Sequence, residues 1–122
     1  MKNKRLFLLD DYRVADSLGK LIRYKGEKDN LEVRVCKTNF KINKIPRDFD
    51  VYIPHLSFID ERDLEDLRKE QPWSWIYGRT GAVNLPELIY NIIDRKYSLI
   101  DGYCIENILN QIKDYRKEDK KW

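Results

Sequence analysis

The sequence has one histidine, two cysteines and no long apolar run, and each shortage excludes a class of protein. No stretch is long enough to span a membrane and no signal peptide is visible, so we expect a cytoplasmic protein with no membrane partner. Cys36 and Cys104 lack the spacing of metal ligands, and we expect reduced thiols. With one histidine, no HExxH motif and no Ser-His-Asp order, classical nucleophilic catalysis is hard to build.

Charge of one sign is also missing. The 24 basic and 21 acidic side chains are interspersed and leave a net charge of +3, which does not favour nucleic acid as a partner. The 122 residues suffice for one core, so we expect a single domain over residues 1–122 with a short polar tail at about 116–122.

The most informative stretch that is present is Arg5–Asp11, an apolar run that ends in two carboxylates. An uninterrupted apolar run of this length is typical of a strand buried on both faces of a parallel sheet. Such strands present functional groups at their C-terminal ends, so we expect Asp10 and Asp11 at the mouth of any site. The alternative is that the two acids only end the strand and cap the following helix.

Apolar segments alternate with helical patterns along the rest of the chain. The expected strands are Arg5–Asp11, Leu31–Lys37, Phe49–Ile53, Trp73–Tyr77 and Tyr97–Ile100. Amphipathic patterns predict helices at about 12–26, 60–70, 84–93 and 105–115, and a short, poorly periodic helix is expected within 38–47. Five alternations predict an α/β fold, with a single doubly wound parallel sheet and helices on both of its faces.

Three stretches of the chain resemble response-regulator receiver domains. They are Leu6-Phe-Leu-Leu-Asp-Asp-Tyr at the start, Asp50-Val-Tyr-Ile-Pro-His-Leu in the middle, and Tyr97-Ser-Leu-Ile-Asp-Gly-Tyr-Cys-Ile-Glu-Asn-Ile-Leu near the end. The resemblance implies a flavodoxin-like five-stranded sheet of order 2-1-3-4-5. It also implies that Asp10 and Asp11 hold a magnesium ion, and it aligns Tyr103 with the aromatic residue that follows the family's Lys-Pro pair.

The departures from the family pattern decide the functional prediction. The family's phospho-accepting Asp, at the end of the third strand, aligns with His55, and Asp101-Gly102 replaces the Lys-Pro pair of the fifth strand. Only Thr80 could serve as the Ser or Thr that follows the fourth strand. Without an acceptor carboxylate and a cation beside it, aspartyl phosphorylation loses its chemistry. We therefore predict a pseudo-receiver with a degenerate pocket formed by Asp10, Asp11, His55, Thr80 and Asp101.

Two other chemistries stay open at the sequence level. Asp10, Asp11, His55 and Asp101 could form a metal site and make the chain a small phosphoester hydrolase, although a hydrogen-bonded His55 with a pKa raised by nearby acids is the simpler interpretation. The loop Gly78-Arg79-Thr80-Gly81, placed before a helix, could instead bind an anion or nucleotide. It has neither a Walker lysine nor dinucleotide spacing, so a plain loop is the simpler interpretation.

The leading prediction is a phosphorylation-independent interaction or regulatory module with a protein partner or a homodimer. In receivers the face formed by the fourth helix, fifth strand and fifth helix is a common partner surface. By resemblance, the contact falls within residues 84–114, with the candidates Tyr90, Asp94, Arg95, Lys96 and Tyr103. No cofactor is required for this function, and Mg²⁺ is the one cofactor that the acidic pair suggests.

Overall fold

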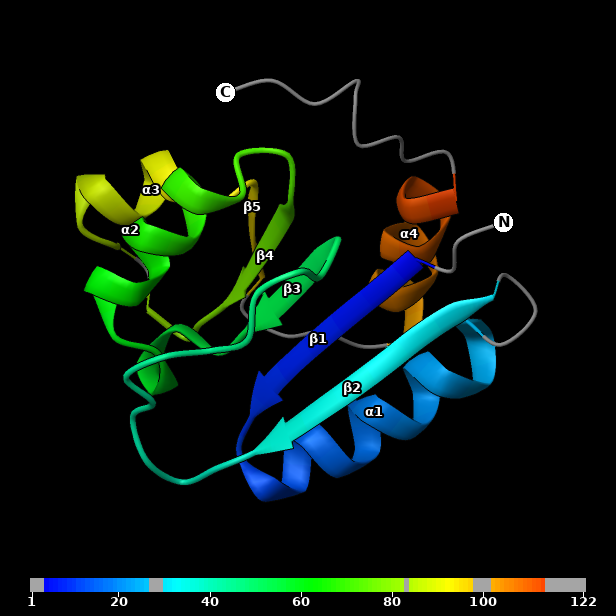
Figure 1. The fold of residues 1–122 in the computed structure, drawn as a ribbon. Coiled ribbons are helices and arrows are strands. Elements are labelled where there is room, and N and C mark those ends of the chain that lie inside the picture. Colours follow the sequence, from blue (N-terminus) through cyan, green and yellow to red (C-terminus); the bar gives the residue numbers. More distant parts are fainter. Residues whose placement is uncertain (1–3, 27–29, 83, 98–101, 114–122) are drawn as a thin grey trace.

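Five parallel strands form one sheet in the order β2-β1-β3-β4-β5, which confirms the predicted topology (Figure 1). The computed structural model describes residues 4–26, 30–82, 84–97 and 102–113. The strands are β1 Lys4–Asp10, β2 Leu31–Lys37, β3 Val51–Pro54, β4 Trp75–Arg79 and β5 Arg95–Tyr97. With this order, β1 and β3 lie at the centre and their C-terminal ends share one edge.

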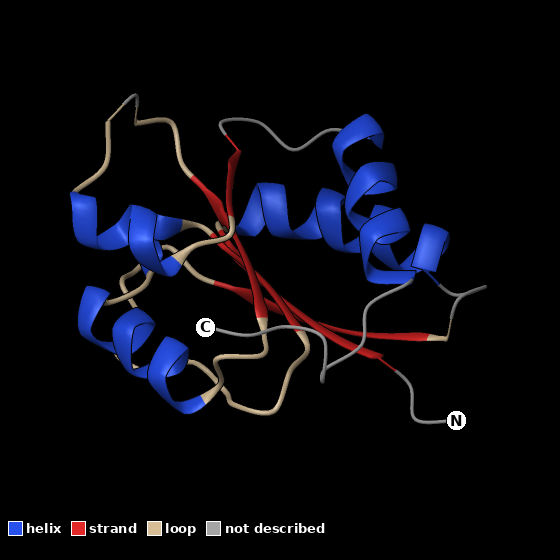
Figure 2. Cartoon of the chain, turned by 90° about the horizontal axis from the view of Figure 1, so that it is seen from above, coloured by secondary structure: helices blue, strands red, loops and turns tan. Residues whose placement is uncertain are grey.

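Helices cover both faces of the sheet (Figure 2). They are α1 Tyr12–Gly26, the short 3-10 helix η2 Leu56–Phe58, α2 Glu61–Glu70, α3 Glu87–Ile92 and α4 Gly102–Lys113. Apolar residues of α1 and α4 pack in one core cluster, and those of α2 and α3 pack in a second cluster on the opposite face. None of the described helices is long and apolar enough to cross a membrane.

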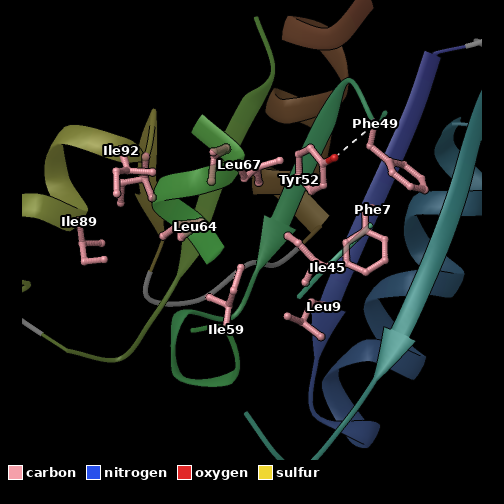
Figure 3. Packing of buried hydrophobic residues seen from close by; sticks show 12 residues of the cluster. Phe7, Leu9, Ile45, Phe49, Tyr52, Ile59, Leu64, Leu67, Ile89 and Ile92 are labelled. Atoms are coloured by element: carbon pink, nitrogen blue, oxygen red, sulfur yellow. Dashed lines mark hydrogen bonds between the residues drawn. The ribbon is translucent and has the colours of Figure 1, made fainter. Parts of the chain in front are cut away.

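Strand β1 connects the two core clusters. Leu6 and Leu8 point into the cluster of α1 and α4, whereas Phe7 and Leu9 point into the other, because successive side chains of a strand face opposite ways. All four are at most 2% exposed, and each contributes roughly 1.5–3 kcal/mol through burial. Figure 3 shows Phe7 beside Phe49 and Leu9 near Ile45 in the second cluster. Burial on both faces explains why the four residues from Leu6 to Leu9 are all apolar.

The helix expected within residues 38–47 is absent, and irregular chain takes its place between β2 and β3. Polar side chains hold this segment against the rest of the molecule. The buried carboxylate of Asp63 accepts hydrogen bonds from the Ile45 amide at 2.8 Å and from Arg47 at 2.7 Å. Gln71 donates to the Phe49 carbonyl at 3.2 Å. The described chain therefore has four α-helices rather than the five that a strict alternation predicts.

Strand β4 begins and ends two residues later than predicted. The prediction placed a strand at Trp73–Tyr77, but parallel pairing of Val51 with Trp75 moves it to Trp75–Arg79. Helix α3 likewise begins at Glu87 instead of Asn84, and no side chain caps its first turn. The shift brings Arg79 into the sheet, at the edge where β1 and β3 also end.

Candidate functional site

Three polar side chains meet at the C-terminal edge of the central strands. Asp10 ends β1, His55 follows β3, and Arg79 ends β4. An isolated parallel bridge pairs His55 with Arg79, and the His55 amide donates to the Leu9 carbonyl at 2.7 Å. The sequence thus correctly brought Asp10 and His55 to one edge, but it placed Arg79 in a loop.

Asp10 and Arg79 form a bidentate ion pair. Arg79 Nε donates to Asp10 Oδ2 at 2.5 Å, and Nη2 donates to Oδ1 at 2.8 Å. The Asp10 side chain is 0% exposed and that of Arg79 is 12% exposed. The carboxylate raises the pKa of Arg79, mainly through these hydrogen bonds and against the effect of burial. Burying a carboxylate this completely requires a cation beside it, and the chain supplies its own.

Asp11 has a different structural role from Asp10. Its Oδ1 accepts a hydrogen bond from the Val14 amide at 2.8 Å, three residues on, which is N-cap geometry for α1. Its own amide donates to Asp10 Oδ1 at 2.8 Å. The sequence left two roles open for the acidic pair, a helix cap or part of a site. Asp11 has the first role, and Asp10 instead forms an ion pair with Arg79 at the edge of the sheet.

His55 begins the short helix η2. Its Nδ1 accepts from the Ser57 amide at 3.1 Å, which places the proton of the neutral ring on Nε2. Burial lowers the pKa of His55, and Arg79 lowers it further, although Asp10 and Asp11 act in the opposite direction. The predicted net rise in the pKa of His55 is wrong, because burial, with Arg79 acting in the same direction, outweighs the upward effect of the two acids.

The residues present do not fit a bound metal ion while Arg79 is in place. Both oxygens of Asp10 accept hydrogen bonds from Arg79, one oxygen of Asp11 caps α1, and Nδ1 of His55 accepts from a backbone amide. Within the described ranges, no three His, Cys, Asp or Glu side chains lie close enough together to hold a metal. Asp101, the fourth member of the predicted cluster, lies outside the described residues.

Comparison with known proteins identifies the architecture. No protein-family model and no curated protein sequence matches the chain. Solved structures do match. The CheY-like receiver domain of Methanospirillum hungatei has a TM-score of 0.71 and 18% identity, covering 97% of this chain and 98% of its own. The chain has the receiver fold. The CheY-like receiver of Methylobacillus flagellatus gives a TM-score of 0.63 at 18% identity, covering 92% and 99% of the two chains.

A further match is the response regulator TrrA of Thermotoga maritima, whose structure is a complex with Mg(2+)-BeF. Its TM-score is 0.58 at 13% identity, with 93% of this chain and 99% of that chain covered. The structural similarity establishes the receiver fold. Identities this low say nothing of the function, which must be argued from the residues of the site.

Arg79 is the last residue of β4. The family resemblance assigned Thr80 to the Ser or Thr that follows the fourth strand. Thr80 lies one residue further on and is 4% exposed. Its amide donates to the Tyr97 carbonyl at 2.8 Å, and its hydroxyl accepts from the Ala82 amide at 3.1 Å. Thr80 thus supports the connection after β4, and Arg79 alone of the two contacts Asp10 within the described residues.

The structural premise of an anion-binding loop at residues 78–81 is wrong. Gly78 is buried inside β4, where an added Cβ would lie 3.0 Å from Leu56. Arg79 is paired with Asp10, and Gly81 is separated from the start of α3 by five residues. No backbone turn at a helix N-terminus is formed here for an anion to occupy.

The predicted interface residues fall in different settings. Tyr90 is 45% exposed on α3, and Arg95 is exposed at the start of β5. The Lys96 ammonium donates to the Ala82 carbonyl at 3.2 Å. Asp94 does not suit the rim of an interface, because its carboxylate accepts from Arg68 and from the Ile76 amide inside the molecule. The side chain of Tyr103 lies outside the described part of the chain.

Sequence reasoning missed the role of Arg79 because the residue lies 69 positions from its partner. One available signal was the acidic pair itself. A carboxylate at the end of a central strand needs a cation, and Arg79 is the basic residue nearest the end of the fourth apolar segment.

Proposed function

We propose that this chain is a receiver-like regulatory module that is not switched by aspartyl phosphorylation and acts through contacts with other proteins. The receiver fold supports the general assignment to signal transduction. The observation that carries the finer proposal is the ion pair in which the guanidinium of Arg79 occupies both oxygens of Asp10.

The chemistry of phosphoryl transfer supports the proposal. Transfer to a receiver needs a carboxylate nucleophile and a metal ion that neutralises the incoming phosphoryl group. His55 follows β3 at the place that the family resemblance assigns to the nucleophile. Arg79 binds the carboxylate that the metal would need, and its charge is fixed at all physiological pH values. The two changes remove the acceptor and the metal together.

The charge of Arg79 also suits a module with one resting state. A metal ion and a phosphoryl group can come and go, whereas an arginine belongs to the chain. We infer that the guanidinium permanently neutralises the edge of the sheet.

Contacts with a partner would be the means of action of such a module. Helix α3 exposes Leu88 at 43% and Tyr90 at 45%, and Arg95 is exposed at the start of β5. Exposed aromatic and arginine side chains are enriched in binding hot spots. A homodimer or a partner protein on this face agrees with the interface that the resemblance implies.

Exposure to acetyl phosphate and Mg²⁺, followed by intact mass measurement, tests phosphorylation independence. We expect no gain of a phosphoryl group by the wild-type chain. The double variant His55→Asp with Arg79→Thr supplies an acceptor and frees Asp10, and it serves as the positive control. A stable, acid-labile phosphoryl adduct on the wild-type chain would overturn the proposal.

Sedimentation velocity over a range of concentrations tests the contact face. We expect self-association that Tyr90→Ala weakens. The matched control is Tyr24→Ala, which removes an aromatic side chain that is 79% exposed on α1, on the other side of the sheet. Equal effects of the two substitutions would contradict the assignment of the face.

A further inference from the structure

A cavity of about 240 Å³ lies between η2, α2 and α3, next to the Asp10–Arg79 pair but separate from it. Its deepest walls are apolar. Ile59, Leu64 and Ile89 are each at most 4% exposed, and Leu56 and Leu85 are partly buried around them. Figure 3 shows Ile59, Leu64 and Ile89 on three separate segments of the chain. The interior therefore suits an apolar group.

Apart from the buried Thr80, the polar side chains of the described lining are exposed at the mouth of the cavity, and the charge among them is negative. Glu61, in the first turn of α2, is the one charged side chain among the lining residues, and it is exposed. Ser57 and Asn84 add exposed uncharged polar groups beside it. The described lining contains no lysine, arginine or histidine, and the ammonium of Lys96, which reaches the lining residue Ala82, donates to its carbonyl at 3.2 Å.

We propose that this cavity binds the side chain of a lysine or arginine presented by a partner protein. Such a side chain has an apolar stem and a charged end, and it commonly buries the stem while its end stays near water. The stem would fill the space between Leu56, Ile59 and Leu85, and the cation would meet Glu61 at the mouth. The inference rests on the proposed role in protein contacts, and it does not depend on the Arg79 argument.

The size of the cavity favours one long side chain over a cofactor. Pockets that bury drug-sized ligands hold roughly 300–1,000 Å³, which exceeds the volume found here. A nucleotide would also require cations for its phosphates, and the lining supplies a carboxylate instead. Charge and volume therefore both point to a basic side chain.

The cavity is lined by chain neighbours of the residues at the Asp10–Arg79 site. Leu56 follows His55 directly, and Thr80 follows Arg79 directly, and both line the cavity. The side chain of Leu56 also packs on Gly78 of β4, where an added Cβ would lie 3.0 Å from it and require it to shift. A bound side chain would thus contact the segments that carry His55 and Arg79.

Two matched probes test the proposal by two-dimensional amide NMR of the full chain. Pentylammonium carries an apolar stem and a positive end, and pentanoate carries a stem of similar length with a negative end. We expect pentylammonium to shift the amides of Ser57, Glu61 and Leu85, and to bind about three- to fivefold more tightly, as one exposed ion pair allows. Equal binding of both probes, or shifts elsewhere on the molecule, would overturn the assignment.

Variants separate charge selection from simple burial. Glu61→Gln should abolish the preference for pentylammonium, whereas Asp66→Asn, which removes a carboxylate of the same helix outside the cavity, should preserve it. Ala82→Phe should fill the mouth and weaken both probes, with an otherwise unchanged amide spectrum as proof of folding. Retained selectivity in Glu61→Gln would contradict the proposal.

A peptide comparison then tests the partner class. We expect a capped Ala-Leu-Lys-Leu-Ala peptide to shift the same amides more than its Glu-centred counterpart. Binding of pentylammonium without binding of the lysine peptide would refute a protein partner. Failure of the probes would leave the phosphorylation test untouched, because that test reads a mass change at a different group.

Discussion

The ion pairs Arg68–Asp94 and Arg79–Asp10 are both largely buried, and they have different roles. Arg68 of α2 pairs with Asp94 at 3.0 Å, and Arg79 of β4 pairs with Asp10 in bidentate geometry. The side chains of the first pair are 9% and 11% exposed, and those of the second are 12% and 0% exposed. Burial alone does not distinguish them.

The hydrogen bonds of the two arginines differ. Arg68 also donates to the carbonyls of Ile92, Ser74 and Pro72, at distances between 2.7 and 3.2 Å. It ties the end of α3 to the turn before β4. Arg79 instead gives two donors to a single carboxylate.

The pKa directions follow from this difference. Burial is the largest influence on Arg68 and lowers its pKa, whereas hydrogen bonding to Asp10 is the largest influence on Arg79 and raises its pKa. Arg68 thus acts as a structural clamp on backbone carbonyls. Arg79 acts as a counter-ion for one acid, the role that a metal ion would have in a receiver of the usual chemistry.

The largest effect is expected for Arg68→Ala. The substitution leaves Asp94 buried without this cation and removes the donor from three carbonyls, so it should lower the free energy of unfolding by about 3–5 kcal/mol. Urea denaturation followed by far-UV circular dichroism measures the loss. A loss below about 1 kcal/mol would show that Arg68 is no clamp.

A smaller loss is expected for Arg79→Ala, because in the described part of the chain Arg79 donates to one carboxylate, whereas Arg68 also donates to three backbone carbonyls. We expect about 2–3 kcal/mol in metal-free buffer, from stranding the Asp10 carboxylate. The double variant Arg79→Ala with Asp10→Asn should recover part of this loss, since no buried charge remains. Strictly additive losses would contradict the view of Arg79 as a counter-ion.

The acidic pair permits a finer comparison. Asp11→Ala removes the cap of α1 and should cost about 1 kcal/mol, while the ion pair beside it stays intact. Asp11→Ser, which keeps an acceptor for the Val14 amide, should recover most of the loss. If serine fails to recover it, the role of Asp11 is electrostatic instead of capping.

The smallest effect is a change in the titration of His55. The pKa of His55 is lowered in the folded chain, so the unfolded chain binds a proton first as the pH falls below about 6.5. Stability should therefore decline on acidification through this range and level off below the folded pKa. His55→Gln should remove this component.

Arg79→Ala should raise the pKa of His55, because it removes a nearby cation and leaves Asp10. Arg68→Ala should leave the pKa of His55 unchanged, because the charges that act on this imidazole are those of Asp10, Asp11 and Arg79. Because the chain has one histidine, the imidazole proton resonances report its pKa directly by NMR. Equal shifts in both variants would mean that the two arginines do not differ at this site.

Local patterns in the sequence were sufficient for the sheet but not for the site. The strand ending in Asp10 was predicted within one residue, because a strand buried on both faces needs consecutive apolar residues, and Leu6 to Leu9 form such a run. The strand ending in Arg79 was misplaced by two residues, because its limits depend on pairing with β3. That two-residue shift separated Arg79 from Asp10 in the prediction.

The segment between β2 and β3 was misjudged for a similar reason. The position of this segment depends on hydrogen bonds to Asp63 of α2 and to Gln71, the residue after α2. No local sequence pattern predicts these contacts. Asp94 is a further case, since an exposed-looking acid proved to be a partner of Arg68. Charged residues that pair across the chain were the ones that sequence patterns could not place.

Titration calorimetry with Mg²⁺ tests the counter-ion account most directly. We predict no measurable binding to the wild-type chain at millimolar Mg²⁺, and binding to Arg79→Ala that Asp10→Asn abolishes. Arg68→Ala, if folded, or otherwise the conservative Arg68→Lys, should bind no Mg²⁺. Binding of Mg²⁺ by the wild-type chain with the same affinity as Arg79→Ala would contradict the claim that Arg79 occupies the place of the metal.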